Sequence, residues 1–329
     1  MKQLAIIASL LIFWSCEKVL FESDASANRE AVFDQLWQTM DEKYTFFDLK
    51  GIDWDQVGER YRQQIEDGMS DEAFFDLLAD MLFELRDGHT NLVSPFDLGR
   101  NWKWYLDHPD NFDANTVERH YLGDDHRITG PMRHQMLSDS ILYIRYASFG
   151  VGLSGEHLNF VLQRAAGAKG VIIDVRSNGG GTTNHALALA SSFIKEPIDA
   201  YTREYKTGPG RDDFSTPEVI RLEPRDNAFT GKVIVLINRR SYSATSFFAS
   251  SMKYHDHITL MGDSTGGGGG TPQDGELGNG WRFRYSATRT FDREGFPIEP
   301  GVAPDVFVNL DPNVPDVDEI IEEAVRLIQ

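Results

Sequence analysis

Three loops carry the residues with which this sequence could do chemistry. The first, residues 174–181, reads Asp-Val-Arg-Ser-Asn-Gly-Gly-Gly and lies between an apolar β-branched run and a helical pattern. Its glycines allow a sharp turn that exposes backbone N–H groups, as the oxyanion of an acyl transfer requires. A phosphate cradle would use the same amides, but no Gly-Lys-Ser/Thr follows and the Gly-x-Gly-x-x-Gly spacing is missing. The other interpretation is a simple strand-to-helix turn.

The second loop, residues 240–246, places several hydroxyl groups between an apolar run and a helical pattern. A serine at a helix start is favoured as a nucleophile, because the helix dipole stabilises developing negative charge there. Ser243 is the best placed, and the N–H of Ala244 beside it could point at an oxyanion. The alternative is that Ser241, Ser243 or Thr245 only caps the helix.

The third loop, residues 85–90, supplies His89 at the end of a helical pattern. A serine nucleophile needs a base, and histidine is the side chain that titrates near neutral pH. A histidine in this position is otherwise a helix cap or a surface residue.

Helical patterns precede these loops, and we expect residues 28–94 to form an N-terminal helical domain. The apolar stripes have helical spacing, and Ser70 is expected to cap the last helix, with Asp71 and Glu72 in its first turn. The stripes contain Phe33, Leu36, Trp37, Met40 and Tyr44, then Trp54, Val57, Tyr61 and Ile65, then Phe74, Leu77, Leu78, Met81, Leu82 and Leu85. Residues 95–140 show weak periodicity and are expected to be irregular or a small β insertion.

Residues 141–329 alternate between short β-branched runs and helical patterns, which predicts an α/β domain with a mainly parallel sheet. WRFRYSATRTF is expected to form one antiparallel strand, and the terminal helix is expected to start at Asp316 or Asp318. The expected strands are ILYIRYA, GVIIDV, VIVLIN and ITLM, and the expected helices are SGEHLNFVLQRAA, residues 184–194, ATSFFASSMKY and DVDEIIEEAVRLIQ.

The chain has 329 residues, with 51 acidic and 32 basic side chains and a formal net charge of −19. The length suggests two domains, or one large domain with an appendage. The acidic excess argues against nucleic acid as a partner, because neutralising phosphates needs a basic face. Cys16 is the single cysteine, which excludes a disulfide within the chain and a cysteine-rich zinc site.

The first fifteen residues are predicted to be an export signal. Lys2 precedes the apolar run LAIIASLLIFW, which is too short to span a membrane, and Ser15 precedes Cys16. A cysteine after such a run resembles a bacterial lipoprotein lipobox, although Phe13 stands where leucine is usual. We therefore expect a lipid anchor at Cys16, a tether over residues 16–27, and a place in the cell envelope, periplasmic or surface-exposed. An ordinary signal peptide is the alternative.

Four motifs, in order, resemble those of the C-terminal processing peptidases (tail-specific proteases) and their tricorn-core branch. They are GVIIDVRSNGGG, VLINRRSYSATS, GDSTGGGGGT and IEPGVAPD. Two earlier segments, FDQLWQTMDEKYTFFDLKGIDW and ELRDGHTNL, resemble the helical domain of tricorn-like members. The resemblance covers residues 28–94 and 141–312. It implies a crotonase-like α/β core related to Clp protease subunits.

On this resemblance, Ser243 is the nucleophile, and the amides of Gly180 and Ala244 form the oxyanion hole. Ser246 replaces a glutamate that is usual in the nucleophile motif. Tail-specific members use a lysine as base, but Gly268 stands at that position here. The nearby Lys253 lies at the wrong place in the pattern.

Tricorn-like members instead use a histidine from the preceding domain, and His89 matches it, with Gly88 replacing a serine. Glu299 is the nearest match to the glutamate that supports this histidine, although it lies one residue closer to the following glycine than expected. A surface carboxylate is the other interpretation of Glu299. Asp87 could orient His89 instead, and His185 is a rival base of lower rank.

The resemblance implies a serine peptidase, in which His89 takes the proton of Ser243 and no metal or cofactor takes part. The interval 95–140 is too short for the PDZ module that selects C-terminal tails in many members, so short or unfolded exported peptides are the expected substrates. The alternative is a non-catalytic lipoprotein that binds a peptide or a hydrophobic ligand on the same fold, and an esterase is a third reading. The oligomeric state is not predicted.

A run of five glycines, residues 266–270, lies between the nucleophile motif and Glu299. Glycine runs are costly to order, so we expect a mobile loop beside the site. A structural turn is the alternative.

Overall fold

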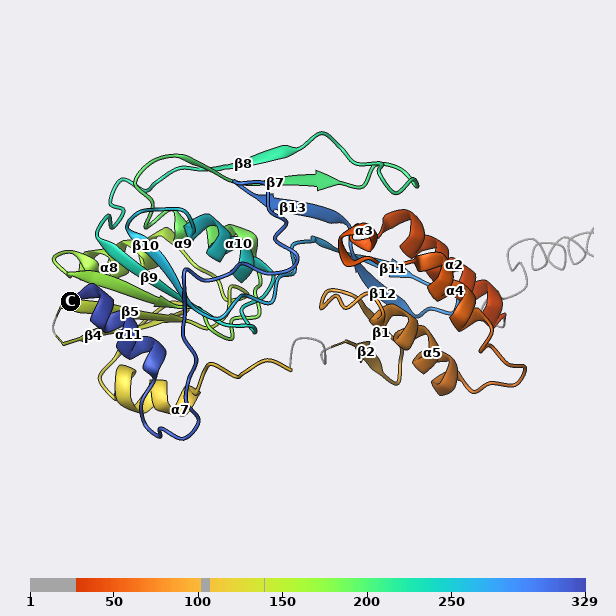
Figure 1. Cartoon of the computed structure of the whole chain (residues 1–329), viewed down its shortest axis with the longest axis horizontal. Helices are drawn as coiled ribbons and strands as arrows, with labels where there is room; N and C mark the ends of the chain where they lie inside the picture. Colours follow the sequence, from red (N-terminus) through yellow and green to blue (C-terminus); the bar gives the residue numbers. More distant parts are fainter. Residues whose placement is uncertain (1–27, 102–106, 139) are drawn as a thin grey trace, which may run out of the picture. The chain divides into compact units, whose positions relative to one another are not determined.

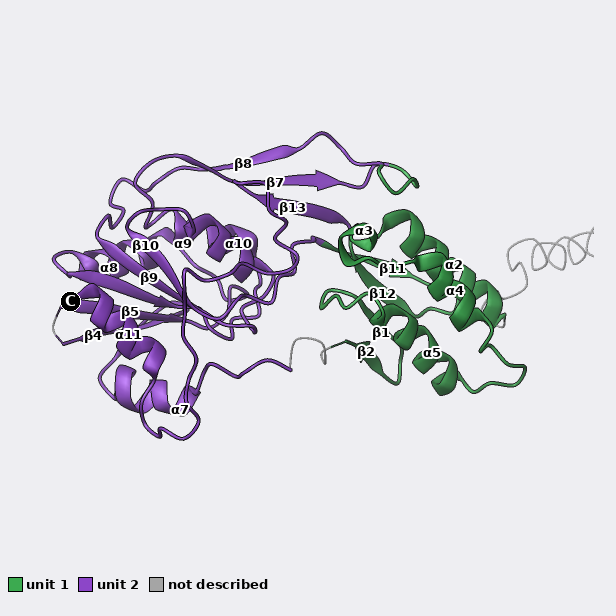
Figure 2. Cartoon of the chain, viewed as in Figure 1, with its two compact units in different colours: residues 1–101, 208–212, 272–286 green, residues 102–207, 213–271, 287–329 purple. Residues whose placement is uncertain are grey.

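The computed structural model describes residues 28–101, 107–138 and 140–329, and it divides into two compact units (Figure 1 and Figure 2). The N-terminal unit has residues 1–101, 208–212 and 272–286, and the larger C-terminal unit has the remainder. Within the described ranges, no helix is both long enough and apolar enough to cross a membrane.

Helices make up most of the N-terminal unit, as the apolar stripes predict. Phe33, Leu36 and Met40 are buried on α2, and Ser70 caps α5 by accepting a hydrogen bond from the Ala73 N–H, as predicted. The helices are α2 (Arg29–Lys43), α3 (Phe47–Lys50), α4 (Trp54–Arg62) and α5 (Asp71–Phe83).

A four-stranded sheet completes this unit, and half of it comes from far along the chain. Its strands follow the order β11-β12-β1-β2, with β1 (Asn91–Val93), β2 (Leu98–Arg100), β11 (Pro272–Glu276) and β12 (Arg282–Ser286). Trp281 packs on Phe74 and Phe75 of α5, so the β11–β12 hairpin belongs to the same core as the helices. The prediction of one strand over WRFRYSATRTF is wrong, because β12 and β13 (Thr288–Asp292) pair in different sheets.

The C-terminal unit is built on a seven-stranded sheet with the order β14-β10-β9-β6-β5-β4-β3. The five strands from β14 to β5 pair in parallel, and β4 and β3 extend the sheet antiparallel, as the strand and helix alternation predicts. The strands are β3 (Arg127–Thr129), β4 (Met132–Leu137), β5 (Ile141–Tyr146), β6 (Gly170–Asp174), β9 (Lys232–Ile237), β10 (Ile258–Gly262) and β14 (Val306–Phe307).

Both faces of this sheet are covered, which explains its continuous apolar runs. On β6, Val171 and Ile173 join one buried cluster and Ile172 joins the other, as alternation along a strand requires. Figure 1 shows α9 and α10 over one face and α11 over the other. The covering helices are α8 (Gly155–Ala165), α9 (Thr183–Ala190) and α10 (Ala244–Met252) on the first side, and the π-helical turn η2 (Val117–Leu122) with α11 (Glu319–Ile328) on the second.

Smaller elements complete the unit. A three-stranded sheet has the order β13-β7-β8, with β7 (Ile198–Tyr205) and β8 (Glu218–Leu222). The short helix α7 (Ala114–Thr116) leads into η2. Helix α11 starts after Asp318, which caps it by accepting from the Ile321 N–H, one of the two starts that the sequence predicts.

A buried ion-pair network lies at the carboxyl end of β6, directly before the glycine loop. Arg176 donates to both carboxylate oxygens of Asp174, at 3.0 and 2.6 Å, and to Asp318 at 3.0 Å, and all three side chains are inaccessible. Burial alone would raise the pKa of Asp174, but Arg176 and Arg145 lower it below its ordinary value. Burial raises the pKa of Asp318. The guanidinium therefore fixes the start of the glycine loop to the cap of α11.

We expect the substitution Arg176→Met to lower the free energy of unfolding by about 3–5 kcal/mol, because it leaves buried carboxylates without their cation. The double variant Arg176→Met/Asp174→Asn should recover part of that loss, since it removes one of the two unpaired charges. Urea denaturation of both variants measures this. Equal stability of Arg176→Met and the unchanged chain would show that the network is not a stabilising unit.

Candidate active site

Ser243 lies at the turn between β9 and α10 in a backbone conformation that side chains rarely adopt. Its φ is 56° and its ψ is −120°, and its side chain makes no capping hydrogen bond to the helix. Strain of this kind persists only where the surroundings enforce it, and it is common at functional sites. The Ser241 hydroxyl donates to the Val175 carbonyl and that of Thr245 to the Asn178 carbonyl. The interpretation of these hydroxyls as helix caps is therefore wrong.

The glycine loop after β6 lies directly against this turn. A Cβ atom on Gly180 would lie 2.9 Å from Ser243 Cβ and 3.0 Å from the Ala244 nitrogen, and the φ of Gly180 is +97°. Only glycine fits there. Both the positive φ and the close approach to Ser243 and Ala244 explain why the sequence has glycine at this position. The structure thus brings together Ser243, Gly180 and Ala244. The Gly180 N–H itself donates to Asn178 Oδ1 at 3.0 Å.

Asn178 connects three segments around Ser243. Its Oδ1 also accepts from the Phe149 N–H at 3.3 Å, and its Nδ2 donates to the Tyr146 carbonyl at 3.0 Å. Its own carbonyl accepts from the Tyr242 N–H at 3.0 Å. Asn178 is fully buried. The sequence motif contained this residue, but nothing in its type or spacing identified it as the side chain that organises the loop.

The glycine run 266–270 is buried and hydrogen-bonded, so the prediction of a mobile loop is wrong and the structural-turn alternative holds. The Gly267 carbonyl accepts from the Ser243 N–H at 2.8 Å and from the Ser246 hydroxyl at 2.7 Å. A Cβ on Gly267 would lie 1.8 Å from the Glu299 carbonyl oxygen. The run is glycine because neighbouring backbone approaches it too closely for side chains. Ser246 therefore holds this run against the nucleophile turn.

Gly268 shows why a lysine has no place at this position. Its φ is +78°, and an added Cβ would lie 2.6 Å from the ring of Tyr242. The Tyr242 ring thus fills the space into which a side chain at residue 268 would extend. Lys253, at the far end of α10 from Ser243, donates to the Ala303 carbonyl at 2.7 Å.

Glu299 and His185 also belong to the C-terminal unit. Glu299 is 5% exposed, so it is not a surface carboxylate, and its Oε2 accepts from the Gly269 N–H at 2.8 Å. The glycine run therefore contacts both Glu299 and Ser243. The ring of His185 bonds the Phe149 carbonyl through Nδ1 at 2.9 Å.

His89 lies in the N-terminal unit, in the loop between α5 and β1. Asp87 is buried and accepts from the His89 backbone N–H and from the Ser286 hydroxyl, each at 2.8 Å. Burial would raise the pKa of Asp87, but the charges of Lys50 and His89 lower it below its ordinary value. Asp87 therefore fixes the backbone that carries His89 and connects it to β12.

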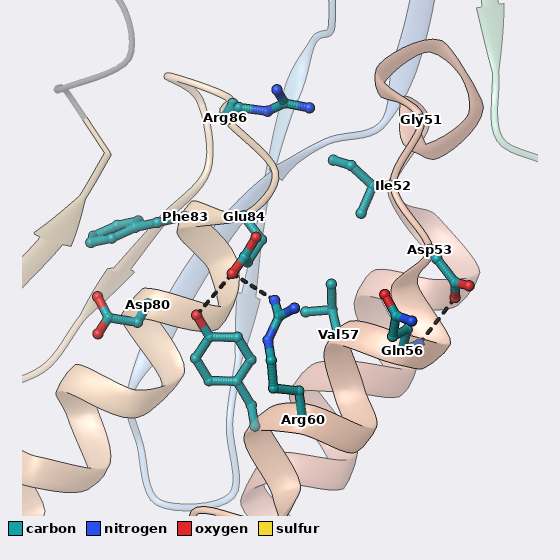
Figure 3. Close-up of a pocket in the computed structure, with 11 residues that line it drawn as sticks. Gly51, Ile52, Asp53, Gln56, Val57, Arg60, Asp80, Phe83, Glu84 and Arg86 are labelled. Carbon is teal, nitrogen blue, oxygen red and sulfur yellow. Dashed lines mark hydrogen bonds and ion pairs between the residues drawn. The ribbon is translucent and has the colours of Figure 1, made fainter.

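A cavity of about 490 Å³ lies in the same unit, where Arg86 forms part of its wall (Figure 3). Arg86 has a φ of +47° and exchanges hydrogen bonds with Lys50, each donating to the other's carbonyl. One oxygen of Glu84 accepts from Arg60 at 2.6 Å and from Tyr61 at 3.1 Å (Figure 3). The charged side chains of Glu84, Arg60 and Arg86 thus have hydrogen-bond partners within this unit. The contacts of Arg86 also connect this cavity to the loop of His89.

The predicted site residues therefore fall in two groups. Ser243, Gly180 and Ala244 meet within the C-terminal unit, where Glu299 bonds the glycine run that also accepts from the Ser243 N–H. His89 lies in the N-terminal unit with Asp87. Cys16 lies outside the described residues. In the described ranges, no three His, Cys, Asp or Glu side chains are grouped so that they could hold a metal ion.

Comparisons with known proteins bear on the family and the fold of the chain. Residues 140–308 match peptidase family S41, and residues 25–83 match the tricorn protease C1 domain. A proposed peptidase from Parabacteroides merdae is 41% identical with a TM-score of 0.87, and the match covers 91% of this chain and 96% of that chain. The tricorn protease structure has a TM-score of 0.56 at 16% identity, covering 91% of this chain and 37% of its own, which shows a shared fold.

Among curated sequences, the carboxy-terminal processing protease CtpA of Bacillus subtilis is 28% identical over 145 residues, which is 44% of this chain and 29% of that protein. The chain spans less than a third of the length of this and other curated relatives that it matches. The resemblance to tail-specific proteases, and the α/β core preceded by helices that it implies, are confirmed.

We expect Asn178→Ala to slow the reaction of Ser243 with a serine-directed phosphonate by about tenfold or more. The reason is that the buried N–H groups of Phe149 and Gly180 lose their acceptor, which costs about 1–3 kcal/mol for each group. The labelling rate should be measured below the melting temperature of every variant, with the surface substitution Asn159→Ala as control. Asn178→Asp keeps the acceptor and should be less impaired. An unchanged rate in folded Asn178→Ala would rule out the organising role.

Proposed function

The chain belongs to peptidase family S41, and from that premise we propose that it hydrolyses peptide bonds by acyl transfer to Ser243. The observation that carries the proposal is the strained Ser243 at the start of α10, with Gly180 in contact behind it. A helix N-terminus stabilises negative charge, and the first amides of a helix lack partners within it. The Ala244 N–H is one of these amides.

The proposed base is His89, which takes the proton of Ser243 as the hydroxyl attacks the peptide carbonyl. The carbonyl oxygen becomes an oxyanion that accepts from the amides of Ala244 and Gly180. His89 then gives the proton to the leaving amine. Water attacks the acyl group by the same route, which restores Ser243.

Two carboxylates are candidates for supporting His89. Glu299 is favoured because its buried carboxylate bonds the same glycine run that accepts from the Ser243 N–H. Asp87 already accepts from the His89 backbone, so its role is to hold the loop.

The Gly180 amide donates to Asn178 in this structure, and it must share or exchange that bond when it binds an oxyanion. Shared bonds of this kind are common for backbone N–H groups.

Substrates are proposed to be exported peptides or unfolded proteins, which can enter a site as extended chains. Such substrates accord with the peptidase family and with the names of the relatives, which are processing proteases.

We expect Ser243→Ala to lower hydrolysis of fluorescein-labelled casein by about 10⁴-fold or more, with loss of phosphonate labelling, because the nucleophile is removed. His89→Gln should have an effect of similar size on hydrolysis. The matched control is His185→Gln, which should retain activity. Activity of Ser243→Ala at the level of the unchanged chain would refute the nucleophile, and activity lost in His185→Gln but kept in His89→Gln would assign the base to His185.

The proposal extends to the location of the protein. Residues 1–15 are proposed to be a lipoprotein signal peptide, and Cys16 the lipidated first residue of the mature chain, held in the cell envelope by a tether over residues 16–27. Expression in a bacterial host with radioactive palmitate tests this. Label should appear in the unchanged chain and disappear in Cys16→Ala. Unlabelled protein, or label that survives Cys16→Ala, contradicts the anchor.

A further inference from the structure

Lys50 is the last residue of α3, and hydrogen bonds tie it to the loop that carries His89. Its Nζ donates to the Arg86 carbonyl at 3.1 Å, and Arg86 Nη2 donates to the Lys50 carbonyl at 3.1 Å. Gly51 ends α3 in the left-handed conformation, with a φ of 64°. The ammonium group of Lys50 is therefore held at the residue that directly precedes Asp87.

The surroundings of this contact are largely apolar and dry. Phe46 is 2% exposed, and Lys50 Nζ lies 5.7 Å from the centroid of its ring. Asp87 is 1% exposed and accepts from the Ser286 hydroxyl and the His89 backbone N–H. Charges interact more strongly across such a region than across water. The charge of Lys50 is therefore effective at Asp87.

Two positive charges act on the Asp87 carboxylate, one from each side chain beside it. Burial would raise the pKa of Asp87, the charge of Lys50 is the largest influence that lowers it, and the charge of His89 comes next. Interactions of this kind are reciprocal, so the Asp87 carboxylate also favours the charged form of His89. An imidazolium cannot take the proton of a serine, so a buried carboxylate beside a base needs a counter-charge.

The other charged side chains around Asp87 are poorly suited to supply that counter-charge. Those on α3, on the last turn of α5 and the loop after it, and on β12 are exposed to water, which screens them, or paired with a neighbour. They are Asp48, Asp80, Glu84, Arg86, Arg282 and Arg284. Lys50 is thus the cation that the fold holds at this carboxylate.

We propose that Lys50 is a positioning residue for His89, because its ammonium group neutralises Asp87 and so keeps the imidazole uncharged and able to accept a proton. The inference rests on the proposed function in one respect, namely that His89 is the base. It also separates the two effects of Asp87. The carboxylate holds the backbone of the loop, and Lys50 prevents its charge from trapping the histidine in the protonated form.

The test uses the whole chain and three substitutions. Lys50→Met removes the charge and keeps an apolar side chain over Phe46, whereas Lys50→Arg keeps the charge. Asp87→Asn removes the opposite charge and retains an oxygen that can accept from the His89 N–H. The matched control is Lys43→Met, an exposed lysine at the end of α2 in the same unit.

The first measurement is the titration of the His89 imidazole by NMR of chain labelled with ¹³C-histidine. The chain has nine histidines, and the signal that is missing in His89→Gln identifies the one that matters. Removing a nearby cation makes an imidazolium easier to form, so Lys50→Met should raise the midpoint by about half a pH unit or more. Asp87→Asn should lower it, and Lys50→Arg and Lys43→Met should leave it nearly unchanged.

The second measurement is the rate at which the serine-directed phosphonate labels Ser243, as a function of pH. The base must be uncharged, so the acid limb of the profile should move to higher pH in Lys50→Met by the same amount as the NMR midpoint. The rate on the high-pH plateau should be retained. A purely structural role of Lys50 would instead lower the plateau and leave the midpoint in place.

An unchanged NMR midpoint in folded Lys50→Met would overturn the proposal, and so would an equal shift in Lys50→Arg, since packing and not charge would then be the cause. A shift of the same sign in Asp87→Asn and Lys50→Met would overturn it as well. An NMR midpoint that moves while the labelling profile stays in place would support the coupling of Lys50 to His89 and refute His89 as the base. The two proposals therefore fail separately.

Discussion

Loop backbone that is buried must have its N–H and C=O groups hydrogen-bonded, and the candidate active site depends on how this requirement is met. Three irregular segments meet at Ser243, and none of them can use a helix or a sheet for the purpose. The carboxamide of Asn178 satisfies groups on two of them, and its carbonyl satisfies the third. The strained turn at Ser243 is held because its neighbours are fixed in this way. An alternative conformation of the turn would leave several buried polar groups without partners.

The glycine run meets the same requirement by a different route. It has no side chains to contribute, so Ser246, the Ser243 N–H and Glu299 supply its partners. Ser246 and Gly268 differ from the glutamate and the lysine that are usual at these positions in the family motifs. In the structure they are complementary, since the Tyr242 ring fills the space beside Gly268 and the small Ser246 reaches the Gly267 carbonyl. A lysine at residue 268 would require a different residue at 242.

The sequence predicted well whatever depends on periodicity. The strands β5, β6, β9 and β10 and their helices were expected from apolar runs, and alternating burial on the two faces of β6 explains why the runs are continuous. It predicted poorly whatever depends on contacts between distant segments. The single strand expected over residues 281–291 is divided between two sheets, because its residues pair with β1 and β7, far away in the chain. The glycine run was misjudged because its order comes from Tyr242 and Glu299, and Asn178 was overlooked because its role is visible only when three loops are assembled.

The network of Arg176 has a consequence for the order in which the molecule can be made. Asp318, which Arg176 needs as a second partner, lies near the end of the sequence, whereas the nucleophile and the glycine loop are translated much earlier. A growing chain that has not yet produced α11 would have to bury a guanidinium beside one carboxylate while the face of the sheet that η2 and α11 share is only partly covered. Synthesis therefore imposes a delay, during which Ser243 has been translated while the loop that supports it is incompletely anchored. The anchoring of the glycine loop beside Ser243 is therefore completed only once α11 has been made.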